Sequence, residues 1–195
     1  NEALDEMEFP VWIKGCFYKA HQAVTRAAAI AEYHVMVAEW GYPIIVQESV
    51  AGDELNVVGV GDGAGGHLGL FAIKKMSVTA QGKVWTGVSV KHEKMLETAE
   101  KLMEHTRWKG PFELECIVDG DDVFLIEVNP RFPAWVYFGS ACGVNLPAAM
   151  VRLALGREVG PTLDYEPGKL FVRYSYELVT DMSRFQQAIT RGEIQ

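Results

Sequence analysis

Four side chains could supply oxygen ligands to a metal: those of Glu113, Glu115, Glu127 and Asn129. They lie on two strands of alternating residues that join at Gly120-Asp121-Asp122. If that loop is three residues long, Glu115 lies directly across from Glu127. Glu113 then lies across from Asn129. Like charges directly opposite one another destabilise a sheet, and a hard cation with oxygen ligands compensates them. The pattern therefore predicts a divalent metal site on one face of this hairpin.

Two other structures stay open for the same segment. Acid-rich strands ordinarily turn their acidic face to water, although here Ile117, Val123 and Leu125 continue that face toward the turn. A loop of two residues would place Glu115 and Glu127 on opposite faces and remove the metal site.

The composition is that of an acidic globular protein. The chain has 195 residues, is 49% hydrophobic and carries a net charge of −8, which argues against a nucleic-acid partner. Its cysteines, Cys16, Cys116 and Cys142, form no CxxC pair and make neither a disulfide framework nor a zinc site. No apolar run approaches the roughly 20 residues of a membrane span. We therefore expect a cytoplasmic protein without a membrane partner.

Strands and helices follow one another in a mixed order that predicts an α+β fold. The glycine-rich segment 61–66 is interpreted as a hairpin turn, because it lacks the lysine and serine of a phosphate-binding loop and no helix follows it. Residues 130–143 read as an irregular loop. The expected strands are 9–14, 42–48, 54–60, 68–74 and 170–178 with a hairpin over 76–88, and the expected helices are 21–40, 92–108, 146–155 and 181–190.

In order, four segments resemble the nucleotide-binding half of the ATP-grasp superfamily, and the last resembles its carbamoyl-phosphate-synthetase and biotin-carboxylase-like branch. The segments are 9–14, 45–54, 110–115 and 125–131.

The resemblance implies an ATP-grasp fold fragment with two lobes of mostly antiparallel sheet and flanking helices, lacking the N-terminal domain of such enzymes. We expect residues 1–50 to form part of the small lobe and 51–160 to form the large lobe with the metal site. Residues 161–195 would be a C-terminal strand–helix extension.

The resemblance also implies how a nucleotide would be held. Lys14 would contact the α-phosphate or the edge of adenine. Gln47, with the backbone of Glu48 and Val50, would read adenine. Glu54 would take the ribose hydroxyls. ATP is accordingly the expected cofactor.

At the phosphates, the resemblance implies a metal-assisted transfer. Glu115, Glu127 and Asn129 would hold two Mg²⁺ ions, with Mn²⁺ as an alternative. Arg131 would stabilise the transferred phosphoryl group, and Lys75 would approach the γ-phosphate.

The implied activity is that of an ATP-dependent carboxylate–amine ligase working through an acyl phosphate on a small-molecule carboxylate and an amine. A catalytically inactive nucleotide-binding or sensing module is one alternative, and a bicarbonate-activating carboxylase or carbamoyl-phosphate-type enzyme is another. A homodimer is left open. One position departs from the amide-ligase pattern: Glu113 stands where such ligases often carry an arginine, and would instead hold an amine or ammonium group.

Overall fold

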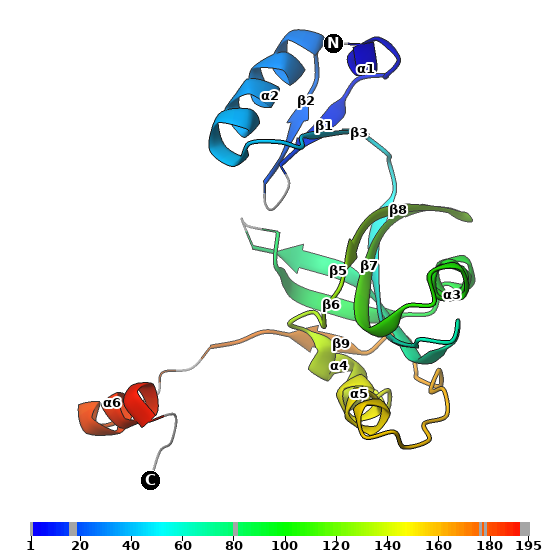
Figure 1. The fold of residues 1–195 in the computed structure, drawn as a ribbon, viewed down its shortest axis with the longest axis vertical. Helices are drawn as coiled ribbons and strands as arrows, with labels where there is room; N and C mark the ends of the chain where they lie inside the picture. The colour runs from blue at the N-terminus through cyan, green and yellow to red at the C-terminus, as the bar shows by residue number, and fades with distance from the viewer. Residues whose placement is uncertain (1, 16–18, 80–81, 176, 178, 192–195) are drawn as a thin grey trace.

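The computed structural model describes residues 2–15, 19–79, 82–175, 177 and 179–191. Two antiparallel sheets organise them, one above the other in Figure 1. The small sheet has the order β2-β1-β3 and the large sheet has the order β8-β7-β4-β5-β6-β9. This mixture of antiparallel sheets and helices confirms the predicted α+β class.

The strands of the small sheet are short and those of the large sheet are longer, apart from its last one. In the small sheet they are β1 (Val11–Lys14), β2 (Ala20–Ala23) and β3 (Ile45–Glu48). In the large sheet they are β4 (Asp53–Asp62), β5 (His67–Val78), β6 (Val84–Val90), β7 (Lys109–Asp119), β8 (Asp122–Asn129) and β9 (Leu170–Val172).

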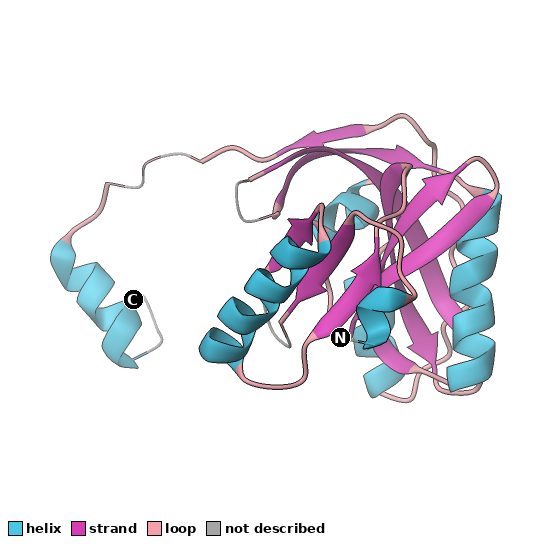
Figure 2. Ribbon diagram, turned by 90° about the horizontal axis from the view of Figure 1, so that it is seen from above, coloured by secondary structure: helices cyan, strands magenta, loops and turns pink. Residues whose placement is uncertain are grey.

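Each sheet is covered by helices whose ends the local sequence defines. After α1 (Glu2–Asp5), α2 (Arg26–Trp40) packs on the small sheet; it begins at Thr25, whose hydroxyl accepts from the Ala28 N–H, and ends at Gly41. In the large sheet α3 (Glu93–Thr106) covers one face, while α4 (Val136–Ala141) and α5 (Leu146–Ala154) cover part of the other. The last helix, α6 (Met182–Arg191), stands apart from both sheets (Figures 1 and 2).

Successive residues of the central strand β4 face two separate cores. Val57 packs in a cluster with Met95 and other residues of α3, whereas Val58 packs in a cluster with Phe71 and residues of α4 and α5. This follows from the period of two in a strand, which sends neighbouring side chains to opposite faces. The α4–α5 layer covers only one end of its face, and polar side chains of the same strands gather at the other end.

The acidic hairpin has the expected pairing of its glutamates, but a two-residue turn and a β-bulge produce it. Its turn has two residues, because Asp119 pairs with Asp122, so the three-residue loop on which the expected pairing depended does not form. A β-bulge between Glu115 and Cys116 then shifts the register by one residue on β8, at Ile126. Glu115 therefore pairs with Glu127, as predicted, and farther along Glu113 pairs with Asn129.

The connection from the small sheet to the large one depends on a glycine. Gly52 has a φ of +145°, and a Cβ atom there would lie 2.6 Å from the carbonyl oxygen of Val118 on β7. Only glycine lets the link run this close to the large sheet. The predicted division of the chain at residues 50 and 160 stays a prediction, although β9 pairs with β6 of the large sheet.

Several predicted boundaries were wrong for reasons of tertiary pairing. The helix expected from residue 21 begins at Arg26, because His21 pairs with Ile13 as part of β2. The segment expected as an irregular loop contains α4, and the strand expected over 170–178 ends at Val172. The glycine-rich segment is the predicted hairpin turn, in which the Asp62 carboxylate accepts backbone N–H groups. No helix of the described residues is long and apolar enough to cross a membrane.

Phe71 provides a test of how the large lobe is held together. Its ring centroid lies within 6.3 Å of those of Trp135 and Phe138, at the start of α4, and of Tyr165, in the segment before β9. Because Phe71→Ala leaves a cavity among them, we expect it to lower the free energy of unfolding by about 3–5 kcal/mol in urea titrations. The control Phe124→Ala, at a 41% exposed residue, should cost less than about 1 kcal/mol. Equal losses at the two positions would contradict this packing.

Candidate functional site

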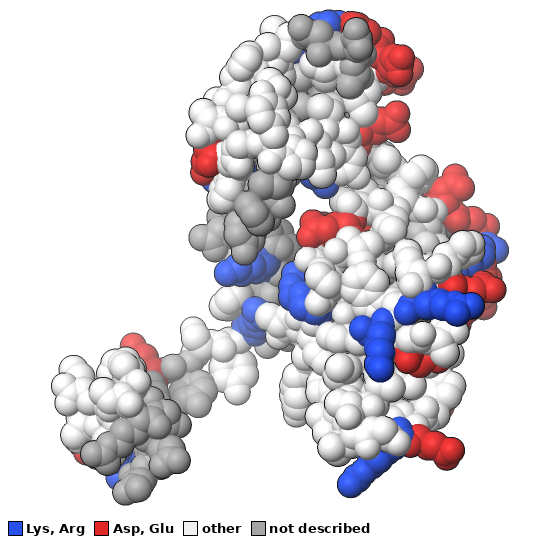
Figure 3. Space-filling model, in the orientation of Figure 1, with Lys and Arg blue, Asp and Glu red and all other residues white. Residues whose placement is uncertain are grey.

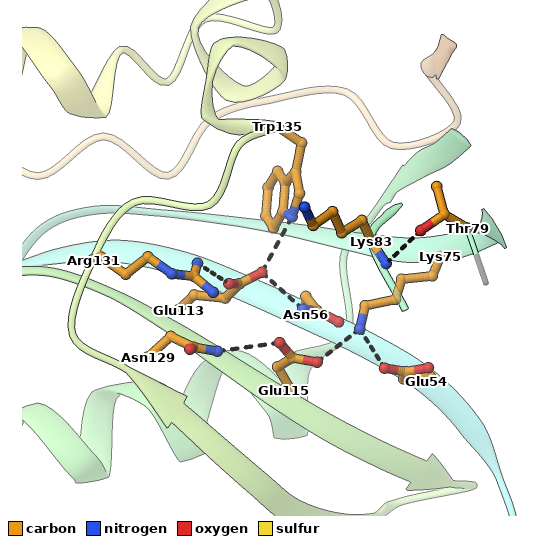
Figure 4. Close-up of polar contacts among 10 residues, drawn as sticks. All are labelled: Glu54, Asn56, Lys75, Thr79, Lys83, Glu113, Glu115, Asn129, Arg131 and Trp135. Carbon is orange, nitrogen blue, oxygen red and sulfur yellow. Dashed lines mark hydrogen bonds and ion pairs between the residues drawn. The ribbon is translucent and has the colours of Figure 1, made fainter. Parts of the chain in front are cut away.

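A polar cluster occupies the end of the large sheet that α4 and α5 leave open (Figure 4). Its side chains come from four neighbouring strands, β5, β4, β7 and β8, and from the segment that follows β8. The cluster consists of Glu54, Asn56, Lys75, Glu113, Glu115, Asn129, Arg131 and Trp135.

Glu113 is a buried carboxylate that three donors hold in place. Its exposed fraction is 3%. Its Oε2 atom accepts from Arg131 Nη1 at 2.6 Å, and its Oε1 atom accepts from Asn56 Nδ2 at 2.9 Å and Trp135 Nε1 at 3.1 Å. A buried charge is tolerated when it is paired and hydrogen-bonded in this way. Glu113 therefore binds groups of its own chain, rather than the free amine that the sequence suggested for it.

Arg131 is fixed at one end and open at the other. Its bond to Glu113 holds one nitrogen, yet its side chain is 55% exposed. A guanidinium has five N–H donors, so several remain for an anion.

Lys75 bridges two carboxylates of the cluster. Its Nζ atom donates to Glu115 Oε2 at 2.7 Å and also to Glu54, while its side chain is only 7% exposed. Burial alone would lower the pKa of Lys75, but the negative charges of Glu115 and Glu54 outweigh burial and raise that pKa above its ordinary value. The ammonium therefore stays charged throughout the neutral range, and it supplies part of the compensation that the opposed glutamates require.

The predicted metal ligands fit a hard cation in their chemistry. Glu115 and Glu127 are partners across β7 and β8, and an Asn129 amide N–H group donates to Glu115 Oε1 at 3.1 Å, which leaves the Asn129 carbonyl oxygen as an available ligand. The set contains only two acids, and no group of three His, Cys, Asp or Glu side chains in the described ranges can hold a metal. Such a site would need further oxygen ligands from outside the chain, and Mg²⁺ is an ion that usually keeps such ligands.

A buried acceptor without a hydrogen-bond donor lies in the same polar cluster. Asn56 is fully buried, and its Oδ1 atom has no hydrogen-bond partner among the described residues. Because its Nδ2 atom is committed to Glu113, the oxygen faces the remaining part of the cluster. A buried orphan acceptor is costly unless a donor, an ion or water meets it.

The residues predicted to hold adenine lie apart from the cluster. Gln47 and Glu48 are on β3, paired with Trp12 and Val11 of the small sheet, and Lys14 ends β1. Figure 3 shows the surface hollowed between the lobe of the small sheet and that of the large one, with charged side chains near the opening.

Among the residues described, no recorded side-chain contact joins the small-sheet candidates to the polar cluster. Val50 lies in the link between β3 and β4, and within the same described ranges Glu127 has no recorded side-chain partner. The roles expected of Lys14, Gln47, Glu48, Val50 and Glu127 stay predictions.

Sequence reasoning missed Asn56 and the contact that Trp135 makes with Glu113. Asn56 follows Glu54 by two residues on one strand, so the alternation of β4 was a signal that could have found it. Trp135 follows an irregular segment and reaches Glu113 from outside the sheet, and no local pattern indicates that contact.

Solved structures share this architecture. D-alanine–D-alanine ligase from Bacillus anthracis, crystallised with ATP, matches 80% of the chain with a TM-score of 0.60 and 14% identity, over 56% of its own length. N5-carboxyaminoimidazole ribonucleotide synthetase from Thermus thermophilus matches 87% with a TM-score of 0.67 and 17% identity, over 47% of its length. The biotin carboxylase domain of a thermophilic 2-oxoglutarate carboxylase, bound to bicarbonate, matches 80% with a TM-score of 0.57 and 16% identity, over 37% of its length. These likenesses show the ATP-grasp fold.

Sequence relatives are far longer than this chain. The carbamoyl phosphate synthase large chain of Clostridium acetobutylicum is 23% identical over 81% of the chain, and that of Thermoanaerobacter sp. is 22% identical over 97%. The chain spans only 16% and 19% of their respective lengths.

A match to a family model identifies the protein family of this chain. The model described as "ATP-grasp in the biosynthetic pathway with Ter operon" matches residues 42–176, which is more than half of the chain and includes β4 to β9. The chain therefore belongs to this ATP-grasp family.

Proposed function

We propose that this chain is the ATP- and Mg²⁺-binding part of an ATP-dependent ligase that joins a small-molecule carboxylate to an amine through an acyl phosphate. Its membership of the ATP-grasp family supports ATP-dependent ligation in general. The observation that carries the finer proposal is the placement of Lys75 and Arg131 beside Glu115, Asn129 and Glu113 on one face of the sheet.

The candidate site residues have distinct parts in this proposed reaction. Lys75 neutralises charge on the γ-phosphate with the N–H donor that its bonds to Glu115 and Glu54 leave free. Arg131 directs its free N–H groups to the phosphoryl group as it moves to the carboxylate oxygen. Glu113 keeps that guanidinium in one orientation. Glu54 accepts from the ribose hydroxyls, while Gln47 and the backbone of Glu48 and Val50 read adenine.

The bound metal, held by Glu115, Glu127 and Asn129, would neutralise phosphate charge as the phosphoryl group moves. An amine then attacks the acyl phosphate, whose phosphate is a good leaving group. The acceptors are small molecules, the expected compartment is the cytoplasm, and Mn²⁺ is an alternative metal.

A second candidate is activation of bicarbonate in place of an organic acid. It is favoured by the names of the matched proteins, which include carbamoyl phosphate synthases and a biotin carboxylase domain bound to bicarbonate. ADP formation by the intact protein, measured with a panel of carboxylic acids and amines and separately with bicarbonate, tests both. Nucleotide binding without turnover under any of these conditions would favour a sensing module and overturn the ligase.

Loss of one metal ligand tests the chemical step. Glu127→Gln keeps the size of the side chain but removes a charge from the metal site, so we expect Mg²⁺-dependent ADP formation to fall about 100-fold or more. Asp122→Asn, at an exposed residue at the start of β8, is the control and should retain activity. Full activity of the Glu127 variant would refute its role as a metal ligand.

Glu54 tests the orientation of the nucleotide. A carboxylate that accepts from ribose hydroxyls distinguishes ATP from 2′-deoxy-ATP, so the wild-type protein should bind ATP about tenfold more tightly. In Glu54→Gln that preference should shrink markedly, as measured by calorimetry. The neighbouring Asp53→Asn, which loses only an exposed ion pair with Lys74, should keep it. An unchanged preference in the Glu54 variant would place the ribose elsewhere.

Glu113 is a positioning residue in this proposal, because it acts through Arg131. Glu113→Gln preserves the shape but weakens the charged bond, so kcat should fall about 10- to 100-fold while the Kd for ATP changes less than about twofold. Steady-state kinetics and calorimetry separate the two quantities. If kcat stayed constant while the protein lost stability, Glu113 would be a purely structural residue.

A further inference from the structure

A cavity of about 810 Å³ lies beside the polar cluster, between α4 and β9. This volume is typical of small-molecule sites. Its walls are mainly aromatic and aliphatic, and they include Tyr137, Phe138, Leu170, Val172 and Tyr174. The ring centroids of Phe138 and Phe171 are 5.0 Å apart, so the helix and the strand that form the two walls are packed together.

One cation on the cavity wall lacks a counter-charge. Arg173 is half-buried, and its guanidinium has no ion pair or hydrogen bond among the described residues. The other cation on the wall, Lys169, pairs with Glu166 at 2.8 Å, and a carboxylate oxygen of Asp164 lies 3.8 Å from Lys91 Nζ. Charged groups that are partly withdrawn from water are usually paired, and a guanidinium fork matches the oxygens of a carboxylate or a phosphate.

The cavity is connected to the proposed reaction centre through Trp135. This residue lines the cavity and is 4% exposed, and its indole N–H donates to Glu113. Glu113 in turn holds Arg131. A molecule in the cavity therefore lies against the same side chain that helps to orient the arginine.

We propose that this cavity binds a small molecule that carries an oxyanion on an aromatic or branched apolar body, with the oxyanion paired to Arg173. The apolar body packs on the aromatic walls, and the guanidinium supplies two parallel N–H donors. The oxyanion is a carboxylate or a phosphate monoester. That this molecule is a substrate rests on the proposed ligase function, whereas its binding does not.

The test measures binding to the intact protein without nucleotide. The probes are phenylacetate, phenyl phosphate and the neutral phenylacetamide, and the readout is the NMR signal of the Trp135 indole N–H, assigned with Trp135→Phe. We expect at least one anion to shift this signal and to bind about tenfold or more tightly than the amide. The tighter anion identifies the source of the oxyanion. Binding of neither anion, or equal binding of anions and amide, overturns the proposal.

Two variants and a matched control locate the bound molecule. Arg173→Gln should weaken anion binding about tenfold and leave amide binding unchanged, because only the charged bond is lost. Ala141→Phe should abolish binding of all probes by filling the cavity, whose wall includes Ala141. Arg152→Gln, at an exposed arginine of α5, should bind like the wild type. Unchanged anion affinity in the Arg173 variant overturns the proposal, even if the protein still binds the probes.

The same measurements separate this proposal from the ligase function. If anion binding depends on Arg173 but no acid or bicarbonate supports ADP formation, the ligase function fails and the cavity remains a binding site. If ADP forms but the probes do not bind, the proposal of an oxyanion site in the cavity is wrong and the ligase function remains.

Discussion

Two carboxylates lie within the large sheet, and a cation from the same chain holds each of them. Glu113 pairs with Arg131, and Glu115 pairs with Lys75. Removing a carboxylate from water costs several kcal/mol unless a partner compensates it, so these pairs must form together with the sheet. The two positive groups are consequently fixed in position before any ligand arrives. Electrostatic catalysis requires that arrangement, because groups that are already oriented need no reorganisation during the reaction.

The polar cluster remains open to a ligand because α4 and α5 cover only one end of that face of the large sheet. Side chains of β4 alternate between the α3 core and the opposite face, and on that face α4 and α5 pack only over Val58 and the residues beyond it. Toward the start of β4, the same alternation presents Glu54 and Asn56. One periodic pattern thus builds a hydrophobic core at one end of a strand and a polar site at the other. The link through Gly52 then brings the small sheet next to the polar end.

The pairing of Glu115 with Glu127 could be predicted from alternation, but the reason for the pairing could not. The turn has two residues, which by itself would have put the glutamates on opposite faces, and the bulge at Ile126 restores the register. Bulges depend on how a strand bends against its neighbours, and the local sequence does not specify this. The contact of Trp135 with Glu113 could not be predicted either, because it joins residues 22 positions apart through the packing of α4. By contrast, the order of the elements and the location of the acidic face followed from patterns of a few residues.

Glu113 stands where amide ligases often carry an arginine, and its contacts explain what a carboxylate does at this position. A carboxylate that receives an ammonium ligand needs accessible lone pairs, and Glu113 is 3% exposed with three donors already bound. A guanidinium nevertheless lies beside this position, because the Nη1 atom of Arg131 reaches the Glu113 carboxylate at 2.6 Å. The negative charge at position 113 therefore orients a positive one. The Arg131 side chain is 55% exposed, so several of its N–H donors remain available to an anion.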